Sequence, residues 1–220
     1  MWARASVWLA ALALCAPLAA CSQQHGGRYH HRFDDAEKWA RVFDDPARDA
    51  WQKPDEVIRA LRLPQDARVA DIGAGTGYFA VRLARAVPAG RVYAVDSAPD
   101  MVRYLGERAK REGVANLVPV QAPESGPNLP GPVDVALLVD VYHHIPSRTE
   151  YFVALRSALG PDGRLAIVDF RVDSSRGPPR SARVPPDAVK QEIARAGYRL
   201  VAEHDFLPDQ YFLVFAPTGR

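Results

Sequence analysis

The chain has 220 residues, which is enough for one ordinary α/β domain and too few for two. Its 28 Lys and Arg nearly balance its 26 Asp and Glu, and a formal net charge of +2 excludes the strongly basic surface of a nucleic-acid-binding domain. The two cysteines, Cys15 and Cys21, are too few for a cysteine-based zinc site, a disulfide framework or an iron–sulfur cluster. Because the chain is nearly neutral, we expect no nucleic-acid partner.

Residues 1–20 predict a signal peptide. They carry one charged side chain, Arg4, ahead of an apolar run that is shorter than the ~20 residues a membrane-spanning helix needs. Residues 18–21, Leu-Ala-Ala-Cys, resemble a bacterial lipobox. The resemblance implies cleavage before Cys21, lipidation of its thiol and, because Ser22 follows, an anchor on the periplasmic face of the outer membrane. The alternatives are an ordinary signal peptide with a chance cysteine and an uncleaved anchor.

Residues 21–35 are expected to form a tether ahead of a single domain over residues 36–220. The segment after Cys21 is polar and rich in Gly and His, as a solvated linker is. Its histidines, His25, His30 and His31, leave weak metal binding as an alternative, which the linker interpretation outweighs.

From residue 54 onward, helices and strands are predicted to alternate. Proline followed by two acids begins a helix over residues 54–61, and apolar spacing predicts helices over 78–87, 99–112, 147–159 and 185–196. Strands are predicted over residues 68–71, 91–96, 116–121, 133–140, 163–170, 198–207 and 210–216, with loops over 123–132 and 171–184. This order predicts an α/β fold with a doubly wound, mostly parallel seven-stranded sheet. Pro208 and Asp209 alone separate the last two strands, which must form an antiparallel hairpin.

A glycine-rich turn connects the first strand to its helix, with the sequence Asp71-Ile72-Gly73-Ala74-Gly75-Thr76-Gly77. A tight turn needs Gly73, close approach of the backbone to a ligand needs Gly75, and packing of the helix on the strand favours Gly77. The spacing differs from the Gly-x-Gly-x-x-Gly of dinucleotide-binding folds. It resembles the first motif of class I S-adenosylmethionine-dependent methyltransferases, which have a Rossmann-like fold.

That resemblance implies a site for S-adenosylmethionine. Asp71 would contact the methionine amino group, and the backbone of residues 73–77 would lie against the methionine and ribose. Asp96, at the end of the second strand, would accept the ribose hydroxyls, with an N-cap for the next helix as the alternative. Ser97 would line the ribose and Met101 the adenine, although Met101 suits the core equally well. Ala122 stands about where the family has an acid for the adenine amino group, which leaves Glu124 as a substitute candidate.

Residues 133–145 and 159–170 resemble the quinone-biosynthesis and type 11 branch of this superfamily. Asp140, His143 and His144 follow the fourth strand, beside the expected cofactor crevice, and are the candidate catalytic residues. Asp140 would also contact the cofactor. Either histidine could remove a proton from the methyl acceptor, or could instead pack and hydrogen-bond within the loop. Asp140 and Asp169 end strands where catechol-type methyltransferases bind a metal, but Phe170 replaces a further polar ligand, so we expect no metal.

Two further features bear on the acceptor. Arsenite methyltransferases need several reactive cysteines and are excluded, because the mature domain has no free thiol. The loop over residues 171–184 carries four arginines that either attract an anionic acceptor or lipid headgroups, or are simply solvated: Arg171, Arg176, Arg180 and Arg183.

The predicted signal peptide conflicts with the predicted cofactor. The signal peptide would export the chain, whereas S-adenosylmethionine is a cytosolic metabolite. The first hypothesis is a monomeric, envelope-anchored methyltransferase acting on a small or lipid-soluble acceptor. The second is an exported protein that binds S-adenosylmethionine or a nucleoside without turnover. A third is a cytosolic enzyme with a misassigned start, although no Met lies between Met1 and Met101.

Overall fold

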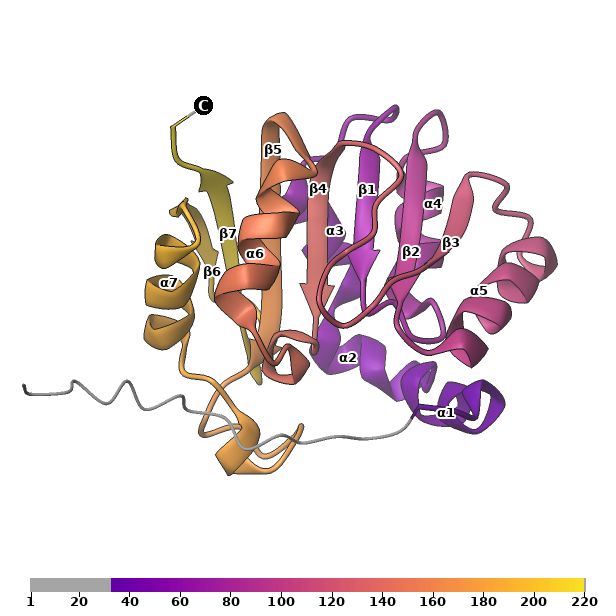
Figure 1. The fold of residues 1–220 in the computed structure, drawn as a ribbon. Helices are drawn as coiled ribbons and strands as arrows, with labels where there is room; N and C mark the ends of the chain where they lie inside the picture. The colour runs from indigo at the N-terminus through magenta and orange to yellow at the C-terminus, as the bar shows by residue number, and fades with distance from the viewer. Residues whose placement is uncertain (1–32, 220) are drawn as a thin grey trace, which may run out of the picture.

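The computed structural model describes residues 33–219, so the predicted signal peptide, Cys21 and most of the tether lie outside the described residues. In that part of the chain, seven strands form one sheet in the order β3-β2-β1-β4-β5-β7-β6 (Figure 1). The strands are β1 (Arg68–Ile72), β2 (Arg91–Asp96), β3 (Leu117–Gln121), β4 (Val133–Val139), β5 (Leu159–Phe170), β6 (Tyr198–His204) and β7 (Gln210–Pro217).

The parallel sheet and its terminal hairpin are confirmed. Strands β3, β2, β1, β4 and β5 pair in parallel, whereas β7 is antiparallel to both β5 and β6. Strand β5 begins four residues earlier than predicted. The helices predicted from residue 54 onward are α3 (Pro54–Leu61), α4 (Tyr78–Ala86), α5 (Pro99–Arg111), α6 (Arg148–Ser157) and α7 (Pro186–Arg195), and all five form.

Two helices and a 3-10 turn precede the predicted elements: α1 (Ala36–Phe43), η1 (Pro46–Arg48) and α2 (Asp49–Gln52). Asp35 caps α1 by accepting a hydrogen bond from the N–H of Lys38 at 3.0 Å, and the ring of Phe33 lies 5.0 Å from that of Trp39. Residues 33–35, within the segment predicted as the tether, therefore pack with α1.

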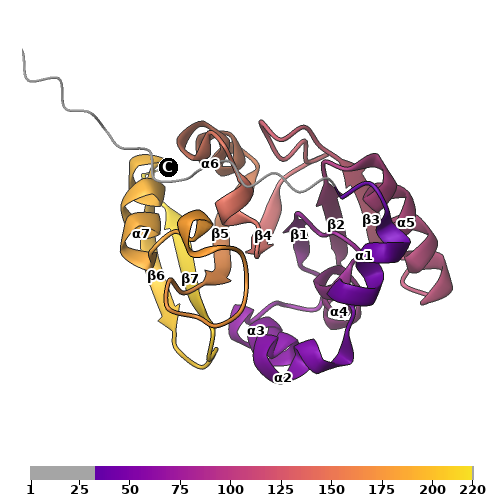
Figure 2. The ribbon, with the colours of Figure 1, turned by 90° about the horizontal axis from the view of Figure 1, so that it is seen from below.

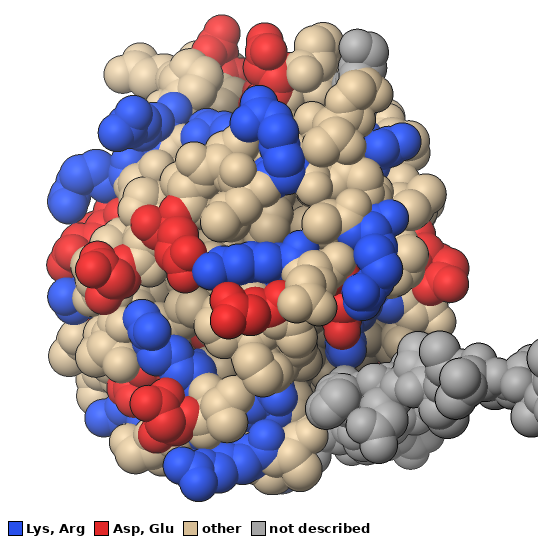
Figure 3. All heavy atoms as spheres, turned by 90° about the vertical axis from the view of Figure 1, so that its left-hand side faces the viewer, with Lys and Arg blue, Asp and Glu red and all other residues tan. Residues whose placement is uncertain are grey.

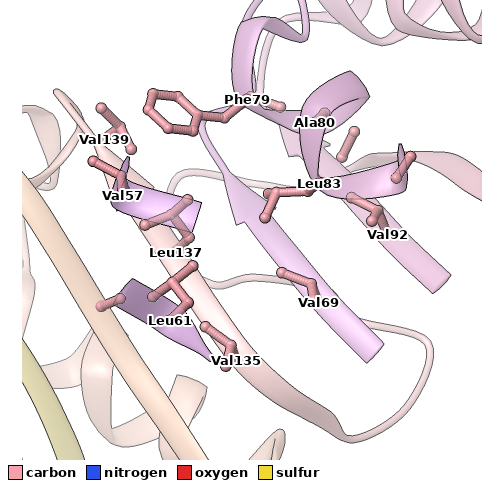
Figure 4. Close-up of a cluster of buried hydrophobic side chains, with 14 of the residues drawn as sticks. Val57, Leu61, Val69, Phe79, Ala80, Leu83, Val92, Val135, Leu137 and Val139 are labelled. Atoms are coloured by element: carbon pink, nitrogen blue, oxygen red, sulfur yellow. The ribbon is translucent and has the colours of Figure 1, made fainter. Parts of the chain in front are cut away.

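Apolar side chains fill both faces of the sheet. On one face, α3 and α4 pack against β1, β2 and β4 through residues such as Leu61, Leu83 and Leu137, with Leu105 of α5 in the same cluster (Figure 4). On the other face, the clustered residues come from α6 and α7. Between β3 and β4 the chain crosses this second face as an irregular segment, as predicted, with Leu129 packed against the cluster.

The outer surface carries charges of both signs. On the side of the molecule formed by α7 and β6, Lys and Arg side chains lie among Asp and Glu side chains (Figure 3). Lys190 of α7, for example, lies 2.8 Å from a carboxylate oxygen of Glu203 on β6. None of the helices among residues 33–219 is long and apolar enough to cross a membrane.

The strand order changes direction between β1 and β4, which are neighbours in the sheet although β2 and β3 follow β1 in the chain. A ligand-binding crevice is expected beyond the carboxyl ends of the strands at such a switch point. Seen from this edge, α1, α2 and the segment between β5 and α7 border the strand ends (Figure 2). These segments decide what can reach the crevice.

Candidate active site

A cavity of about 560 Å³ lies at this edge, within the range typical of small-molecule sites. It opens between the ends of β1, β2 and β4 and the segment that carries α1 and α2. The structure brings these predicted site residues together in its lining: Asp71, Gly73, Ala74, Gly75, Thr76, Asp96, Ser97, Met101, Glu124, Asp140, His143 and His144.

The glycine-rich turn depends on left-handed backbone at three positions, with φ of +69° at Gly73, +54° at Gly75 and +93° at Gly77. The N–H groups of Gly73 and Ala74 both donate to the carbonyl of Val95 on β2, at 2.8 and 2.9 Å. A side chain on Gly73 would clash with Val141. A side chain thus has no room at Gly73, whereas at Gly75 it is the left-handed backbone that favours glycine.

Asp71 is the buried carboxylate beneath this turn. Its Oδ2 is one of two buried side-chain polar atoms among residues 33–219 that have no hydrogen-bond partner. Burial, and after it the charge of Asp96, raises the pKa of Asp71 to about 7, while Arg48 acts in the opposite direction. An unpaired buried carboxylate is costly, and a bound cation such as an ammonium group would offset that cost.

Asp96 joins the end of β2 to the glycine turn. Its Oδ2 accepts a hydrogen bond from the N–H of Gly75 at 2.8 Å, and its Oδ1 accepts one from the N–H of Ala98 at 3.0 Å. Burial nevertheless raises the pKa of Asp96. The N-cap position of α5 is Ala98 and has no side-chain cap, so the alternative role of Asp96 as that N-cap is wrong.

The adenine end of the predicted site is apolar. Met101 is 1% exposed and also lines the cavity, so both interpretations of this residue describe its position. Ala122 is buried against the cavity, and its N–H donates to the carbonyl of Asp96 at 3.0 Å. Glu124 is exposed at the rim.

Asp140 follows β4 with a left-handed φ of +60°, which is unusual for a residue other than glycine. Its Oδ1 accepts a hydrogen bond from Nε2 of Gln210 at 2.5 Å, and Nη2 of Arg48 lies 3.4 Å from its Oδ2. Nε2 of Gln52 donates to Oε1 of Gln210 at 2.7 Å. This buried network ties α2 to the ends of β4 and β7. Burial raises the pKa of Asp140, and the neighbouring Arg48 opposes the rise.

The two histidines after β4 differ in their surroundings. Nδ1 of His143 lies 2.9 and 3.0 Å from the two carboxylate oxygens of Asp169, at the end of β5. The ring of His144 lies 4.1 Å from that of His143 and 5.9 Å from that of Phe33. His143 is therefore hydrogen-bonded to Asp169, which the sequence analysis considered only as a possible metal ligand.

The sequence analysis missed the residues ahead of α3 that line the cavity. They are Phe33, Trp39, Val42, Phe43, Arg48 and Trp51. The rings of Trp39 and Phe43 stack at 5.2 Å, and the guanidinium of Arg48 lies 4.2 Å from the ring centre of Tyr78. The four-residue spacing of Trp39 and Phe43 was the available signal, because it places both rings on one face of a helix.

The arginines after β5 are not all simply solvated, because several of them make hydrogen bonds or ion pairs within the domain. The guanidinium of Arg183 donates to backbone carbonyls of the same segment, including that of Ser174 at 2.6 Å. Arg171 donates to the carbonyl of Gln210 at 3.0 Å, and Arg176 pairs with Asp209 at 3.2 Å. Arg183 thus holds its own segment together and Arg171 joins it to β7, whereas Arg176 and Arg180 are exposed.

No group of three or more His, Cys, Asp or Glu side chains among residues 33–219 is arranged to hold a metal ion. Asp140 and Asp169, the two candidate ligands, instead bond Gln210 and His143.

Known proteins resemble the chain in both sequence and structure. Trans-aconitate 2-methyltransferase of Rhodopseudomonas palustris is 32% identical over 136 residues, which are 60% of this chain and 48% of that protein. Malonyl-[acyl-carrier protein] O-methyltransferase of Geobacter sulfurreducens is 28% identical over 158 residues, 64% of this chain and 59% of that protein. The chain thus spans about half the length of these curated relatives.

Among solved structures, a SAM-dependent methyltransferase from Aquifex aeolicus superposes with a TM-score of 0.76 at 25% identity, covering 82% of this chain and 97% of that one. The family model described as "Methyltransferase domain" matches residues 31–209. The match includes the glycine turn, the acids that end β1 and β2, and the residues after β4. The fold, this site and the family match agree, and the chain belongs to the methyltransferase domain family.

Proposed function

We propose that the protein is an S-adenosylmethionine-dependent methyltransferase acting on a small or lipid-soluble acceptor. The observation that carries this proposal is the unpaired, buried Oδ2 of Asp71 beside the glycine turn and Asp96. When bound, S-adenosylmethionine supplies an electrophilic methyl group on a positively charged sulfur.

The lining residues fit this cofactor. Asp71 offers a carboxylate to the methionine amino group, and Arg48 supplies positive charge for the methionine carboxylate. Asp96 provides oxygens for the ribose hydroxyls, and Met101 and Ala122 form an apolar wall for the adenine. Holding donor and acceptor in line supplies much of the rate acceleration in such a displacement. The chain's role is therefore to bind the cofactor and the acceptor and to orient them. Helices α1 and α2 would exclude water from the cavity.

Calorimetry with the demethylated cofactor, S-adenosylhomocysteine, tests the binding site. The purified wild-type chain should bind it, and Asp71→Asn should weaken binding by roughly ten- to a hundredfold, because a charge-assisted hydrogen bond is worth about 1.5–3 kcal/mol. Asp66→Asn is the matched control, since Asp66 is exposed ahead of β1. Failure of the wild type to bind would reject the proposal.

Turnover separates an enzyme from a binding protein. The chain is incubated with methyl-labelled S-adenosylmethionine and fractions of a bacterial lysate, including a lipid extract. Label that moves into an extractable product supports methyl transfer. Binding without transfer to any fraction favours the alternative of an exported binding protein.

We also propose that the chain is exported and anchored to the periplasmic face of the outer membrane through a lipid on Cys21, and that it acts as a monomer. The support is the lipobox-like sequence of residues 18–21. Acyl chains add about 0.8 kcal/mol of membrane affinity per buried methylene, so several chains anchor a protein firmly.

Metabolic labelling with a fatty acid, followed by membrane fractionation, tests the anchor. Cys21→Ser should abolish the label, and the matched variant Cys15→Ser should keep it. Unlabelled wild-type protein in the cytosolic fraction would reject export and favour a cytosolic enzyme. Sedimentation of the purified chain tests the monomer.

A further inference from the structure

His143 and Asp169 form a pair with fixed geometry. Besides Nδ1 of His143, the Asp169 carboxylate accepts hydrogen bonds from the N–H of Phe170 at 2.7 Å and the N–H of His143 at 3.2 Å. The two side chains are only 4% and 3% exposed. Because three donors converge on one carboxylate, Asp169 is fixed in place and cannot rotate away from the imidazole.

This pairing sets the tautomer of the imidazole. A carboxylate that already accepts two N–H donors faces Nδ1, so Nδ1 carries a proton and Nε2 is the basic nitrogen. Within residues 33–219, Nε2 is neither hydrogen-bonded nor among the buried polar atoms that lack a partner. His143 also lines the cavity. Its free basic nitrogen is therefore placed to meet a bound molecule.

The cavity that His143 lines is rich in aromatic rings. Phe33 packs on His144, and Trp51 lies 5.8 Å from Phe170. These rings come from three separate parts of the chain and line the same cavity as His143. Flat apolar surfaces favour a flat apolar ligand, because aromatic rings gain from stacking or edge contacts in addition to burial.

We propose that His143 is the catalytic base for a phenol-type hydroxyl on an apolar, ring-bearing acceptor, and that Asp169 is the residue that positions His143. This inference rests on the proposed methyltransferase function. The acceptor O–H proton passes to Nε2, and the freed oxygen pair forms the new bond to the methyl carbon. The pair of the broken carbon–sulfur bond stays on sulfur as a neutral thioether, and the imidazolium then releases its proton to water. No oxidant or other reactant is needed.

Several charged groups act on His143. Burial lowers its pKa, but Asp169 and Asp140 more than compensate, so the pKa lies above that of an ordinary histidine. The rate should therefore rise with pH through a pKa above the ordinary histidine value, as the imidazole becomes neutral. The charged and titratable groups that face the pair come from the ends of β4 and β5, from η1, α6 and β7 and from its own turn: Asp140, Asp169, Arg48, Arg148, Tyr211, Tyr142 and His144.

The first test measures proton transfer without turnover. The purified chain is saturated with S-adenosylhomocysteine and titrated with 4-nitrophenol, whose ionised form absorbs visible light. Bound 4-nitrophenol should ionise at a lower pH than the free phenol, and His143→Asn should remove that shift. His204→Asn, a histidine on β6, should keep it. A shift that survives His143→Asn but disappears in Arg48→Met would overturn the proposal, as would the absence of 4-nitrophenol binding.

The second test compares methyl transfer to phenol, which ionises near pH 10 as tyrosine does, with transfer to pentafluorophenol, which is already ionised at neutral pH. His143→Asn should slow transfer to phenol by about a hundredfold or more, the usual contribution of a general base. Transfer to pentafluorophenol should slow less than tenfold. Equal losses for both acceptors, or no transfer to either by the wild type, would overturn the proposal.

The third test concerns Asp169. In histidine-labelled protein, NMR should show His143 protonated at Nδ1, with a pKa above that of an ordinary histidine. Asp169→Asn should lower the His143 pKa and shift the pH profile of phenol methylation to lower pH. Asp162→Asn, at the exposed far end of β5, should change neither. A merely structural Asp169 would leave the His143 pKa unchanged after mutation, which would reject its positioning role.

The outcomes separate this inference from the function on which it rests. Failure of the wild type to bind S-adenosylhomocysteine rejects the proposed function. Normal binding in every variant, together with equal losses of rate for the two acceptors in His143→Asn, rejects only the base. The NMR measurement needs no ligand and tests the pair in either case.

Discussion

The N–H of Gly75 donates a hydrogen bond to Oδ2 of Asp96, 2.8 Å away, so the turn after β1 and the end of β2 form one unit. Both residues line the cavity. The acid expected to meet a ribose therefore also fixes the backbone that approaches the cofactor. A mutation at Asp96 should affect binding in two ways, by removing ligand acceptors and by releasing the turn.

Asp96→Ala should weaken S-adenosylhomocysteine binding by more than tenfold. The variant loses acceptors for charge-assisted hydrogen bonds, each worth about 1.5–3 kcal/mol, and leaves the Gly75 N–H without its partner. Asp96→Asn keeps one acceptor oxygen, and its affinity should lie between those of the wild type and Asp96→Ala. Calorimetry at constant pH gives the affinities. Equal affinity for wild type and Asp96→Ala would contradict the ribose assignment.

Binding should depend on pH through Asp71. Burial and the charge of Asp96 raise its pKa to about 7 in the unliganded protein, and an ammonium ligand favours the ionised form. The affinity for S-adenosylhomocysteine should therefore increase as the pH rises through about 7. Asp71→Asn should bind weakly with little of this dependence. A wild-type affinity that is flat between pH 6 and 8 would contradict the prediction.

The same shift predicts a stability change of opposite sign. The folded-state pKa of Asp71 lies above its unfolded value, so ionisation disfavours the fold. Stability of the unliganded protein is therefore lost as pH rises from the unfolded pKa towards 7. Asp71→Asn should accordingly melt at a higher temperature than wild type at pH 8, although it binds worse. Calorimetric melting with Asp66→Asn as control checks this, and a lower melting temperature for Asp71→Asn would refute it.

Alanine substitutions at three glycines should change the free energy of unfolding by different amounts. Gly75→Ala keeps ordinary contact with Phe43 at 3.5 Å, so its cost is the left-handed backbone, about 1–2 kcal/mol. Gly73→Ala should cost more, because its new side chain also meets Val141. Gly106→Ala in α5 has room, with Pro119 at 3.7 Å, and should stabilise by about 0.5–1 kcal/mol. Urea unfolding measures all three, and the reverse order would exclude this account of the turn.

Gln210→Leu should destabilise the fold by about 1–3 kcal/mol, because it leaves Asp140 and Gln52 short of a buried partner. The double variant Gln52→Leu/Gln210→Leu should recover part of that loss, since the amide of Gln52 is then absent too. Urea unfolding of both single variants and the double variant gives the coupling. Strictly additive losses would show that the two amides act independently.

The alternation of helices and strands, the glycine turn and the final hairpin were predictable from the sequence because they depend on local features. Apolar periodicity sets each helix and strand, left-handed backbone selects glycine at residues 73, 75 and 77, and the short connection between β6 and β7 permits only a hairpin. The glycine turn and Asp96 line one cavity because parallel strands end at the same edge of the sheet.

The tertiary structure alone decided how the acceptor side of the site is built. Arg48 reaches Asp140 across 92 positions of sequence, and Asp169 meets His143 across 26. The short helices α1 and α2 form where the half-buried rings of Phe33, Trp39, Phe43 and Trp51 pack against the cavity. The four residues of α2 are too few to show a periodicity that could predict it. Contacts of this kind depend on how β4, β5 and β7 are spaced and on which side each strand end faces. Those relations are fixed by packing across the whole sheet and are not encoded in any local stretch of the chain.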